Sequence, residues 1–269
     1  MLTRHLFKKH HWSIFITSIL LCIFFDRALH AQANNDENKN RRARLSLETF
    51  ARQNKGDRSW GRPPSRTSGG SRSSCSEQLV ALVPGENKVS NQGCQGESQS
   101  FVTATVSANP IIWIYVPSTL TEQPAELVIL DSQQRPLSIK SIALPQTEGI
   151  IGLRLDRPLK TNQGYRWQLS ALLHPQSPSQ NPTVEGLITR VAAKSDLTKQ
   201  VATVKSQLET AHSYAEAGIW QDTVTSFANL HCNNPQNNAI ESDWHELLNM
   251  AGLKAIAPFP IVNCKNYSP

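Results

Sequence analysis

The sequence predicts an α+β protein. An antiparallel, immunoglobulin-like β-sandwich of about eight strands occupies residues 75–192, and a C-terminal cap of three helices with an extended tail occupies residues 193–269. Short apolar runs separated by turn-forming residues fill the first region, which is typical of a sandwich. Near Ser195 the hydrophobic period changes from that of strands to that of helices. No ten-residue helical pattern falls between the strand-like runs, which argues against a parallel α/β sheet.

Eight segments carry the strand signal: EQLVALVP, SQSFVTATVS, NPIIWIYVP, AELVILD, PLSIKSIALP, GIIGLRL, GYRWQLSALL and TVEGLITRV. Clusters rich in Pro, Gly, Asn and Ser separate them, including Pro84-Gly85 and Asn109-Pro110. The alternation in TATVS and RWQLS predicts one buried face and one face in water.

Three helical stripes follow. The apolar positions of the first are Leu197, Val201, Val204, Leu208, Ala211 and Ala215; those of the second are Trp220, Val224, Phe227 and Leu230; those of the third are Ile240, Trp244, Leu247, Leu248 and Ala251. Ser195 is the expected N-cap of the first helix, and Gly218 and Gly252 are the expected stops of the first and third. The tail APFPIVNC is too rich in proline for a helix and should run back along the helices.

The helical hairpin AHSYAEAGIWQDTVTSFANL predicts a buried face and a free face. Trp220, Phe227 and Trp244 should form a core with one face of the sandwich, because large aromatics on an apolar stripe are usually buried. That arrangement leaves Gln221, Asp222 and Thr225 on an outer face, which we expect to be a partner-docking surface.

Residues 1–33 have the order of a secretory signal peptide. Basic residues precede an apolar run of 14 residues, Trp12 to Phe25, and Ala31 and Ala33 offer a cleavage site. A membrane-spanning helix needs about 20 apolar residues, so no stable transmembrane anchor is expected after cleavage. The mature protein should therefore be periplasmic or secreted.

Residues 34–74 should form a disordered basic arm, since they are polar and rich in Ser, Gly and Arg. The arm holds 10 basic and 4 acidic side chains, while residues 75–269 hold 13 and 16. The arm therefore has a net charge of +6, and residues 75–269 have a net charge of −3. This asymmetry predicts weak attraction of the arm to an anionic glycan or an acidic envelope protein. A solvated spacer is an equally good interpretation. The exported compartment argues against nucleic acid.

Four cysteines remain in the mature chain: Cys75, Cys94, Cys232 and Cys264. An even number in an exported protein predicts two disulfides, and we expect Cys75–Cys94 and Cys232–Cys264 because each pair flanks one unit. A metal site built from His231, Cys232, His245 and Cys264 is the alternative, although the spacing lacks a zinc pattern.

Several of these segments together resemble a known family. RTSGGSRSSC, PIIWIYVP, AELVILD, GYRWQL, VEGLITRV and YAEAGIWQDTVTSFANL are similar, in this order, to the cyanobacterial domain-of-unknown-function 928 family, over roughly Arg66 to Leu253. The resemblance implies export and no known activity, cofactor or catalytic residue. It also implies a cysteine where this chain has Leu172 and Leu173, which leaves the partner of Cys75 open.

No enzyme motif is present in the sequence. There is neither a Gly-x-Ser-x-Gly elbow nor a His-Glu-x-x-His pair. SRTSGGSR lacks the lysine of a P-loop, although Arg66 or Arg72 could hold an anion there. The carboxylates Asp131, Asp156, Glu185 and Asp222 are scattered, and only two that meet in space could act as a glycosidase pair.

We therefore expect an exported cell-envelope protein that is a non-enzymatic binding or structural module, with no catalytic residue, cofactor or metal. One alternative is a hydrolase of envelope glycans. Another is a periplasmic ligand-binding or sensory partner of a membrane protein.

Overall fold

The structure, a computed structural model, describes residues 67–68, 78–86, 99–100, 102–204, 206–262 and 264. The chain divides into two units, Met1–Arg44 and Leu45–Pro269, and every described residue belongs to the second. The predicted signal peptide lies outside the described residues, as does the predicted arm apart from Thr67 and Ser68. Thr67 forms a bridge with Val80, so pairing with the body begins before residue 75.

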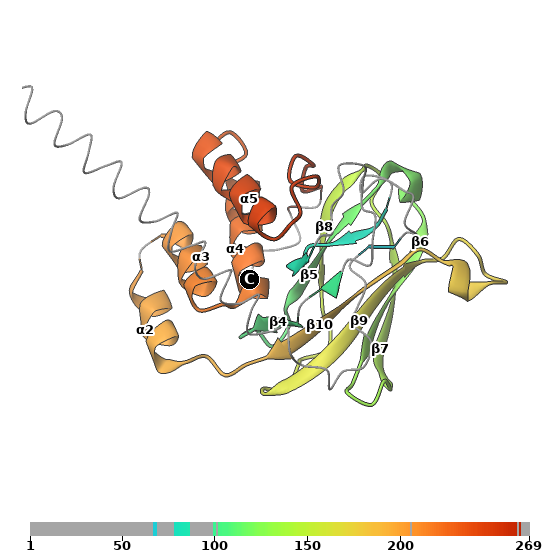
Figure 1. Cartoon of the computed structure of the whole chain (residues 1–269), viewed down its shortest axis with the longest axis horizontal. Coiled ribbons are helices and arrows are strands. Elements are labelled where there is room, and N and C mark those ends of the chain that lie inside the picture. The colour runs from blue at the N-terminus through green and yellow to red at the C-terminus, as the bar shows by residue number, and fades with distance from the viewer. Residues whose placement is uncertain are drawn as a thin grey trace, which may run out of the picture. The chain divides into compact units, whose positions relative to one another are not determined.

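Two β-sheets lie face to face (Figure 1). The smaller has the order β1-β5-β8 and consists of β1 (Val80–Ala81), β5 (Ile111–Val116) and β8 (Gly149–Arg154). The larger has the order β4-β10-β9-β6-β7 and consists of β4 (Val102–Thr105), β10 (Thr183–Arg190), β9 (Gln163–Ala171), β6 (Pro124–Leu130) and β7 (Pro136–Ala143). A separate pair joins β2 (Gly85–Glu86) and β3 (Gln99–Ser100). Each of the eight predicted segments contains a strand, and the α+β class is confirmed.

The prediction that all the strands pair in antiparallel fashion is wrong for one pair of strands. β4 and β10 run parallel, with Val102 opposite Leu187 and Thr105 opposite Arg190. A parallel pair needs a long crossover, and that crossover is usually a helix. Here strands β5 to β9 form the connection, so the absence of a helical pattern did not exclude parallel pairing. The immunoglobulin-like assignment stays a prediction.

Four helices follow the sheets instead of three: α2 (Ser195–Thr203), α3 (Gln207–Glu216), α4 (Trp220–Asn233) and α5 (Asn238–Met250). The first predicted helix is broken, because Val204 is extended and the Ser206 side chain caps a new helix by accepting from the Glu209 amide. The apolar stripe continues across this break, so periodicity did not reveal it. Gly218 and Gly252 have φ of 72° and end α3 and α5 as expected.

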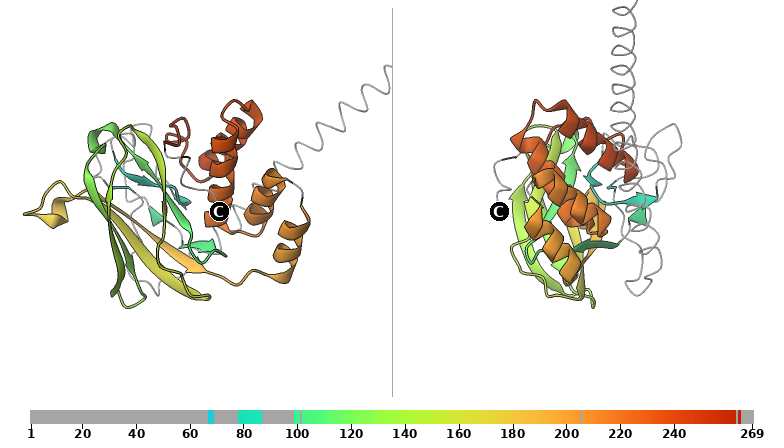
Figure 2. Two further views of the ribbon diagram at one scale, coloured as in Figure 1. Left: turned by 180° about the vertical axis from the view of Figure 1, so that it is seen from behind. Right: turned by 90° about the vertical axis from the view of Figure 1, so that its left-hand side faces the viewer.

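The smaller sheet is covered on both faces. Figure 2 shows the helices beside the smaller sheet. Ile112 and Ile114 of β5 pack toward the larger sheet, while Trp113 and Tyr115 pack with residues of α3, α4 and α5. Strand β5 is therefore buried along its whole length, which explains its uninterrupted apolar sequence. The expected packing of the helical aromatics is confirmed, since Trp220 and Trp244 are each 1% exposed.

Candidate functional site

The predicted docking residues lie against the sandwich and not on a free face. Gln221 is 2% exposed, and its Nε2 donates to the Ile111 carbonyl oxygen. Thr105 Oγ1 donates to Asp222 Oδ2 at 2.7 Å, and Trp113 Nε1 donates to Thr225 Oγ1 at 3.0 Å. The prediction of an outer face at these residues is wrong because α4 packs on β4 and β5, which brings its polar stripe as well as its apolar one against protein.

The same three residues line a pocket of about 190 Å³. Its walls come from the β4–β5 connection, the end of β8, α3 and α4. The lining residues are Thr105, Ser107, Asn109, Pro110, Ile111, Arg154, Tyr214, Gln221, Asp222, Thr225, Ser226 and Asn229. We name this the cap pocket. Most of its side chains carry a hydroxyl, amide or carboxyl group, so its chemistry is that of hydrogen bonding.

Asp222 is the acidic side chain of the cap pocket. Burial raises the pKa of its carboxyl to about 6, against the lowering effect of hydrogen bonds from Thr105 Oγ1 and the Val106 amide. The residue lies in the first turn of α4, where the helix dipole favours a negative charge. Asp222 thus joins the cap to the β4–β5 connection, and its carboxyl can change protonation near neutral pH.

Gln221 lines the pocket and also has one buried, unsatisfied group. Its Nε2 is used by Ile111, but its buried Oε1 has no hydrogen-bond partner among the described residues. Leaving a buried acceptor unpaired costs roughly 1–3 kcal/mol. The atom is itself buried, so it is not a group that the open pocket offers to a bound molecule.

Tyr214, on α3, brings an aromatic ring and a hydroxyl to the same pocket. Burial, and then the charge of Asp222, raises the pKa of its hydroxyl, which therefore stays a neutral donor. The side chains of Tyr214, Ser226 and Asn229 make no hydrogen bond to another residue in the described part of the chain. These groups can bind a ligand without first breaking an internal bond.

A second recess, of about 500 Å³, is lined by basic residues that are largely engaged. Arg135 pairs with Asp131 at 2.7 Å, and Arg157 Nη1 donates to the Leu137 carbonyl at 2.9 Å. The hydrogen bonds from Arg135 and Gln133 hold the pKa of Asp131 below its usual value. Because Arg135 and Arg157, two of its three cations, already have partners, this recess is a weaker candidate than the cap pocket.

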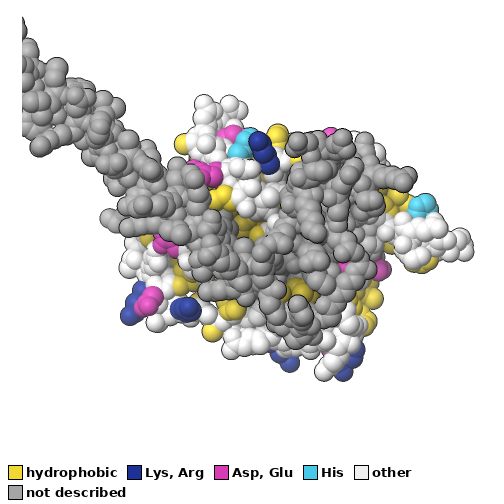
Figure 3. Space-filling model, in the orientation of Figure 1, with side chains coloured by type: hydrophobic (Ala, Val, Ile, Leu, Met, Phe, Trp, Pro, Cys, Tyr) yellow, Lys and Arg dark blue, Asp and Glu magenta, His cyan; other side chains and the backbone are white. Residues whose placement is uncertain are grey.

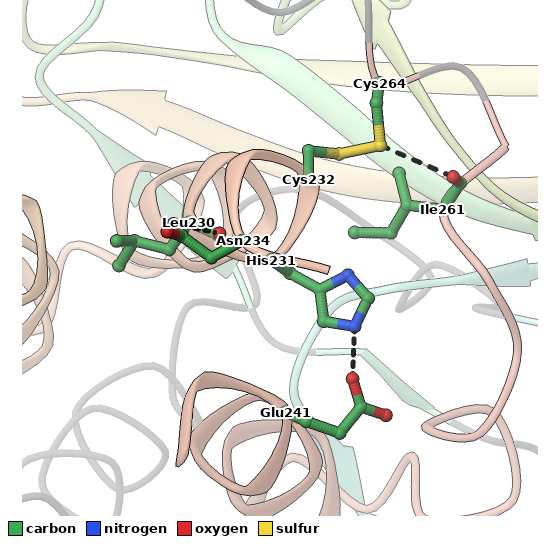
Figure 4. The surroundings of a disulfide bond; sticks show 7 residues. All are labelled: Leu230, His231, Cys232, Asn234, Glu241, Ile261 and Cys264. Carbon is green, nitrogen blue, oxygen red and sulfur yellow. Dashed lines mark hydrogen bonds and ion pairs between the residues drawn. A yellow bond between two sulfur atoms is a disulfide. The ribbon is translucent and has the colours of Figure 1, made fainter. Parts of the chain in front are cut away.

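The predicted Cys232–Cys264 disulfide is present, with the two Cα atoms 5.5 Å apart (Figure 4). It joins the end of α4 to the C-terminal tail. The thiolates that the metal alternative requires are therefore oxidised, and His231 and His245 both contact the carboxylate of Glu241. The described residues contain no group of three or more His, Cys, Asp and Glu that could hold a metal ion.

The remaining predicted site residues either lie outside the described residues or do not come together in one pocket. Cys75, Cys94, Arg66 and Arg72 lie outside the described residues, so the second disulfide and the anion site stay predictions. Of the scattered carboxylates, Asp222 lines the cap pocket, Asp131 lines the basic recess, and Asp156 and Glu185 line neither.

Sequence reasoning missed much of the cap pocket. Asp222, Ser226 and Asn229 follow one another at i, i+4 and i+7, so they form a polar stripe that the helical period could have revealed. Asn109, Arg154 and Tyr214 come from distant segments, and no local pattern could have placed them there.

The connection between β9 and β10 projects from the sheets, and hydrophobic side chains lie at its base (Figure 3). Leu172 and Leu173, at its start, are 37% and 36% exposed. None of the helices in the described ranges is long and apolar enough to cross a bilayer.

The fold and the pocket define a class: a mixed α+β protein whose helices cover one sheet of a two-sheet body and enclose a polar pocket there. Residues 64–261 match the family described as Domain of Unknown Function (DUF928). The chain therefore belongs to the DUF928 family.

Two solved structures of β-glucuronidase from Parabacteroides merdae show a distant likeness. One is 12% identical, covers 56% of this chain and 32% of that chain, and has a TM-score of 0.23. The other structure, which has glycerol in its active site, is 14% identical, covers 55% of this chain and 30% of that chain, and has a TM-score of 0.22. This chain spans about a third of the length of each enzyme, and a likeness at this level carries no argument. No curated protein matches the chain.

Proposed function

We propose that this chain is an exported, non-enzymatic binding module of the cell envelope, with the cap pocket as its ligand site. The observation that carries the proposal is a polar pocket lined by Tyr214, Ser226 and Asn229, whose side chains make no hydrogen bond to another residue in the described part of the chain. A ligand with hydrogen-bonding groups can bind these side chains without first breaking an internal bond.

The predicted signal peptide supports a periplasmic or secreted location, and the family resemblance supports a cyanobacterial source. The disulfide between Cys232 and Cys264 is consistent with an oxidising compartment. The basic arm would add a second, weaker contact to an anionic glycan or an acidic envelope protein.

A hydrolase is the second candidate, because a carboxyl with a pKa of about 6 suits general acid–base chemistry. Glycosidases generally need two carboxyl groups flanking the scissile bond. Asp222 is the single carboxylate among the residues that line the cap pocket. Binding without catalysis therefore accounts for the pocket better than hydrolysis does.

The proposal is tested by sedimenting the purified protein with isolated wall-polymer and membrane fractions. Asn229→Trp should fill the cap pocket, while Asn249→Trp places the same side chain at an exposed position of α5, outside that pocket. We expect the wild-type protein and Asn249→Trp to sediment with one fraction and Asn229→Trp to stay in solution. Equal sedimentation of all three would overturn the assignment of the pocket, and release of reducing ends from the polymer would favour the hydrolase.

A further inference from the structure

Asp222 carries a charge that no cationic side chain pairs with in the described part of the chain. The groups that donate to its Oδ2, the hydroxyl of Thr105 and the amide of Val106, are neutral. These donors and the first turn of α4 stabilise the ionised carboxyl, but they leave its net charge in place. Because the pKa of this carboxyl is about 6, the cap pocket holds an uncompensated carboxylate at neutral pH.

The carboxylate is within reach of a bound molecule, and the one base of the pocket is a weak competitor for its field. Asp222 is half-buried and lines the pocket. Arg154, the base among the lining residues, is exposed and already has another partner. Water and salt screen an exposed charge more effectively than a partly buried one. The charge that a ligand meets inside the pocket is therefore negative.

This charge selects the sign of the ligand. A carboxylate attracts a cation more strongly in a partly buried site than in open water, because the effective dielectric constant is lower there. It repels an anion for the same reason. A hydrogen bond between two charged groups is also roughly twice as strong as one between neutral groups, so a cation is favoured over a neutral molecule of the same shape.

The other lining groups favour an organic cation over a metal ion. Calcium takes about six to eight oxygen ligands, several of which are usually carboxylates, and Asp222 is the single carboxylate that lines this pocket. An ammonium group has three N–H donors, so one carboxylate with neutral acceptors beside it can satisfy it. Ser226 and Asn229 offer such acceptors on the same stripe of α4, and the ring of Tyr214 can attract a cation through its π electrons.

We propose that the cap pocket binds a small organic ammonium ion, either free or at an accessible end of an envelope component, and that its charge pairs with Asp222. Ser226 and Asn229 accept from its remaining N–H groups or bind a neighbouring hydroxyl. The volume of 190 Å³ equals roughly six water molecules at about 30 Å³ each, which is room for one short amine. This inference rests on the proposed function, since it names the ligand class of the same site.

The test is a calorimetric titration of the purified full chain at neutral pH with two sets of matched compounds. Ethanolamine and glucosamine are cations, ethylene glycol and glucose are their neutral matches, and glycolate and glucuronate are anions. We expect at least one cation to bind about tenfold or more tightly than its neutral match, and neither anion to bind. Asp222→Asn removes the charge and keeps an acceptor for Thr105 and Val106, so it should weaken cation binding about tenfold or more. Asp196→Asn, at an exposed position of α2, should leave the binding unchanged.

The pH dependence of binding is a second readout. Cation binding should weaken as pH falls through about 6, because protonation removes the charge of Asp222. Arginine stays charged over this range and Tyr214 stays neutral, so Asp222 is the lining group that titrates there. Asn229→Trp should abolish the binding, and Asn249→Trp should leave it unchanged.

Thermal melts establish which variants are folded, and the pH series and Asn229→Trp keep the test decisive if Asp222→Asn does not fold. Excess free amine that releases the protein from the envelope fraction would place the ligand on the envelope, whereas retention would indicate a free solute. Neutral or anionic compounds that bind as tightly as the cations would overturn the ligand class, as would cation binding that survives in Asp222→Asn or Asn229→Trp.

The sedimentation experiment separates failure of this inference from failure of the proposed function. If no amine binds but sedimentation still depends on Asn229, the ligand class is wrong and the proposed function stands. If an amine binds at Asp222 but sedimentation is independent of Asn229, the pocket is an amine site and its envelope role is wrong. If no amine binds and sedimentation is independent of Asn229, both are wrong.

Discussion

Asp222 couples the stability of the fold to pH. Its pKa is about 6 in the folded protein and 3.8 in an unfolded chain, so the folded state binds the proton more tightly. Between these values the folded state holds more protons, and the free energy of unfolding therefore decreases as pH rises. The decrease is complete above about pH 6 and amounts to at most about 3 kcal/mol, since one pKa unit corresponds to about 1.4 kcal/mol.

Asp222→Asn should remove this dependence, because the amide oxygen can still accept from Thr105 and Val106 while the charge is absent. Urea melts between pH 4 and 8 measure the effect. The control, Asp196→Asn, changes an exposed carboxylate of α2 and should keep the wild-type profile. Identical profiles for Asp222→Asn and the wild-type protein would show that the carboxyl is not desolvated as described.

Trp220 is the residue on which the packing of α4 depends most. It is 1% exposed, and its Nε1 donates to the Leu82 carbonyl at 2.9 Å. Trp220→Ala should lower the free energy of unfolding by roughly 3–5 kcal/mol, as core truncations of this size do. Leu173→Ala, at a position 36% exposed, should change it by less than about 1 kcal/mol. A neutral result for Trp220→Ala in a denaturant melt would contradict the burial of this side chain beside Leu82.

The roles of Trp220 and Gln221 were not equally predictable. An apolar stripe at helical spacing indicated that Trp220 and Phe227 are buried, and both are. The same logic assigned Gln221 to water because it is polar. The assignment of Gln221 to water is wrong because α4 contacts protein on its polar side as well as on its apolar side. Hydrophobic periodicity identifies only the apolar side.

At the scale of elements, the Cys232–Cys264 disulfide fixes the tail to α4. The two residues are separated by 32 positions. A loop of that length should contribute about 3–4 kcal/mol by restricting the unfolded chain. The double variant Cys232→Ser with Cys264→Ser should lose this amount in a urea melt. Reduction of the wild-type protein should cost at least as much, because it would also break the predicted Cys75–Cys94 bond. Peptide mapping without reduction that found free thiols at both positions would contradict the bond.

Strands and helices were predictable where the signal was local. The eight strand segments and the stops at Gly218 and Gly252 follow from alternation, turn residues and glycine conformation. The break between α2 and α3 depends on the side chain of Ser206 competing for a backbone amide, which an uninterrupted apolar stripe conceals. The parallel pairing of β4 with β10 joins residues more than 80 positions apart, and no local pattern encodes it.

At the scale of the whole molecule, the charge asymmetry predicts a salt-dependent contact. The arm, residues 34–74, carries +6 and residues 75–269 carry −3. Exposed charges are screened beyond about 8 Å at physiological salt, so binding to an anionic polymer should fade as salt is added. Deletion of residues 34–63 removes most of this charge and keeps Thr67, which pairs with Val80. Unchanged retention on heparin after this deletion would contradict a binding role for the arm.

We propose that the ligand binds at the junction of α4 with the β4–β5 connection. Hydrogen–deuterium exchange of the purified protein, with and without the envelope fraction that retains it, tests this claim most directly. We expect new protection in the segments Thr105–Ile111 and Trp220–Asn233 and little change in the β9–β10 connection. Protection confined to the β9–β10 connection or to the basic arm, with none at α4, would contradict it.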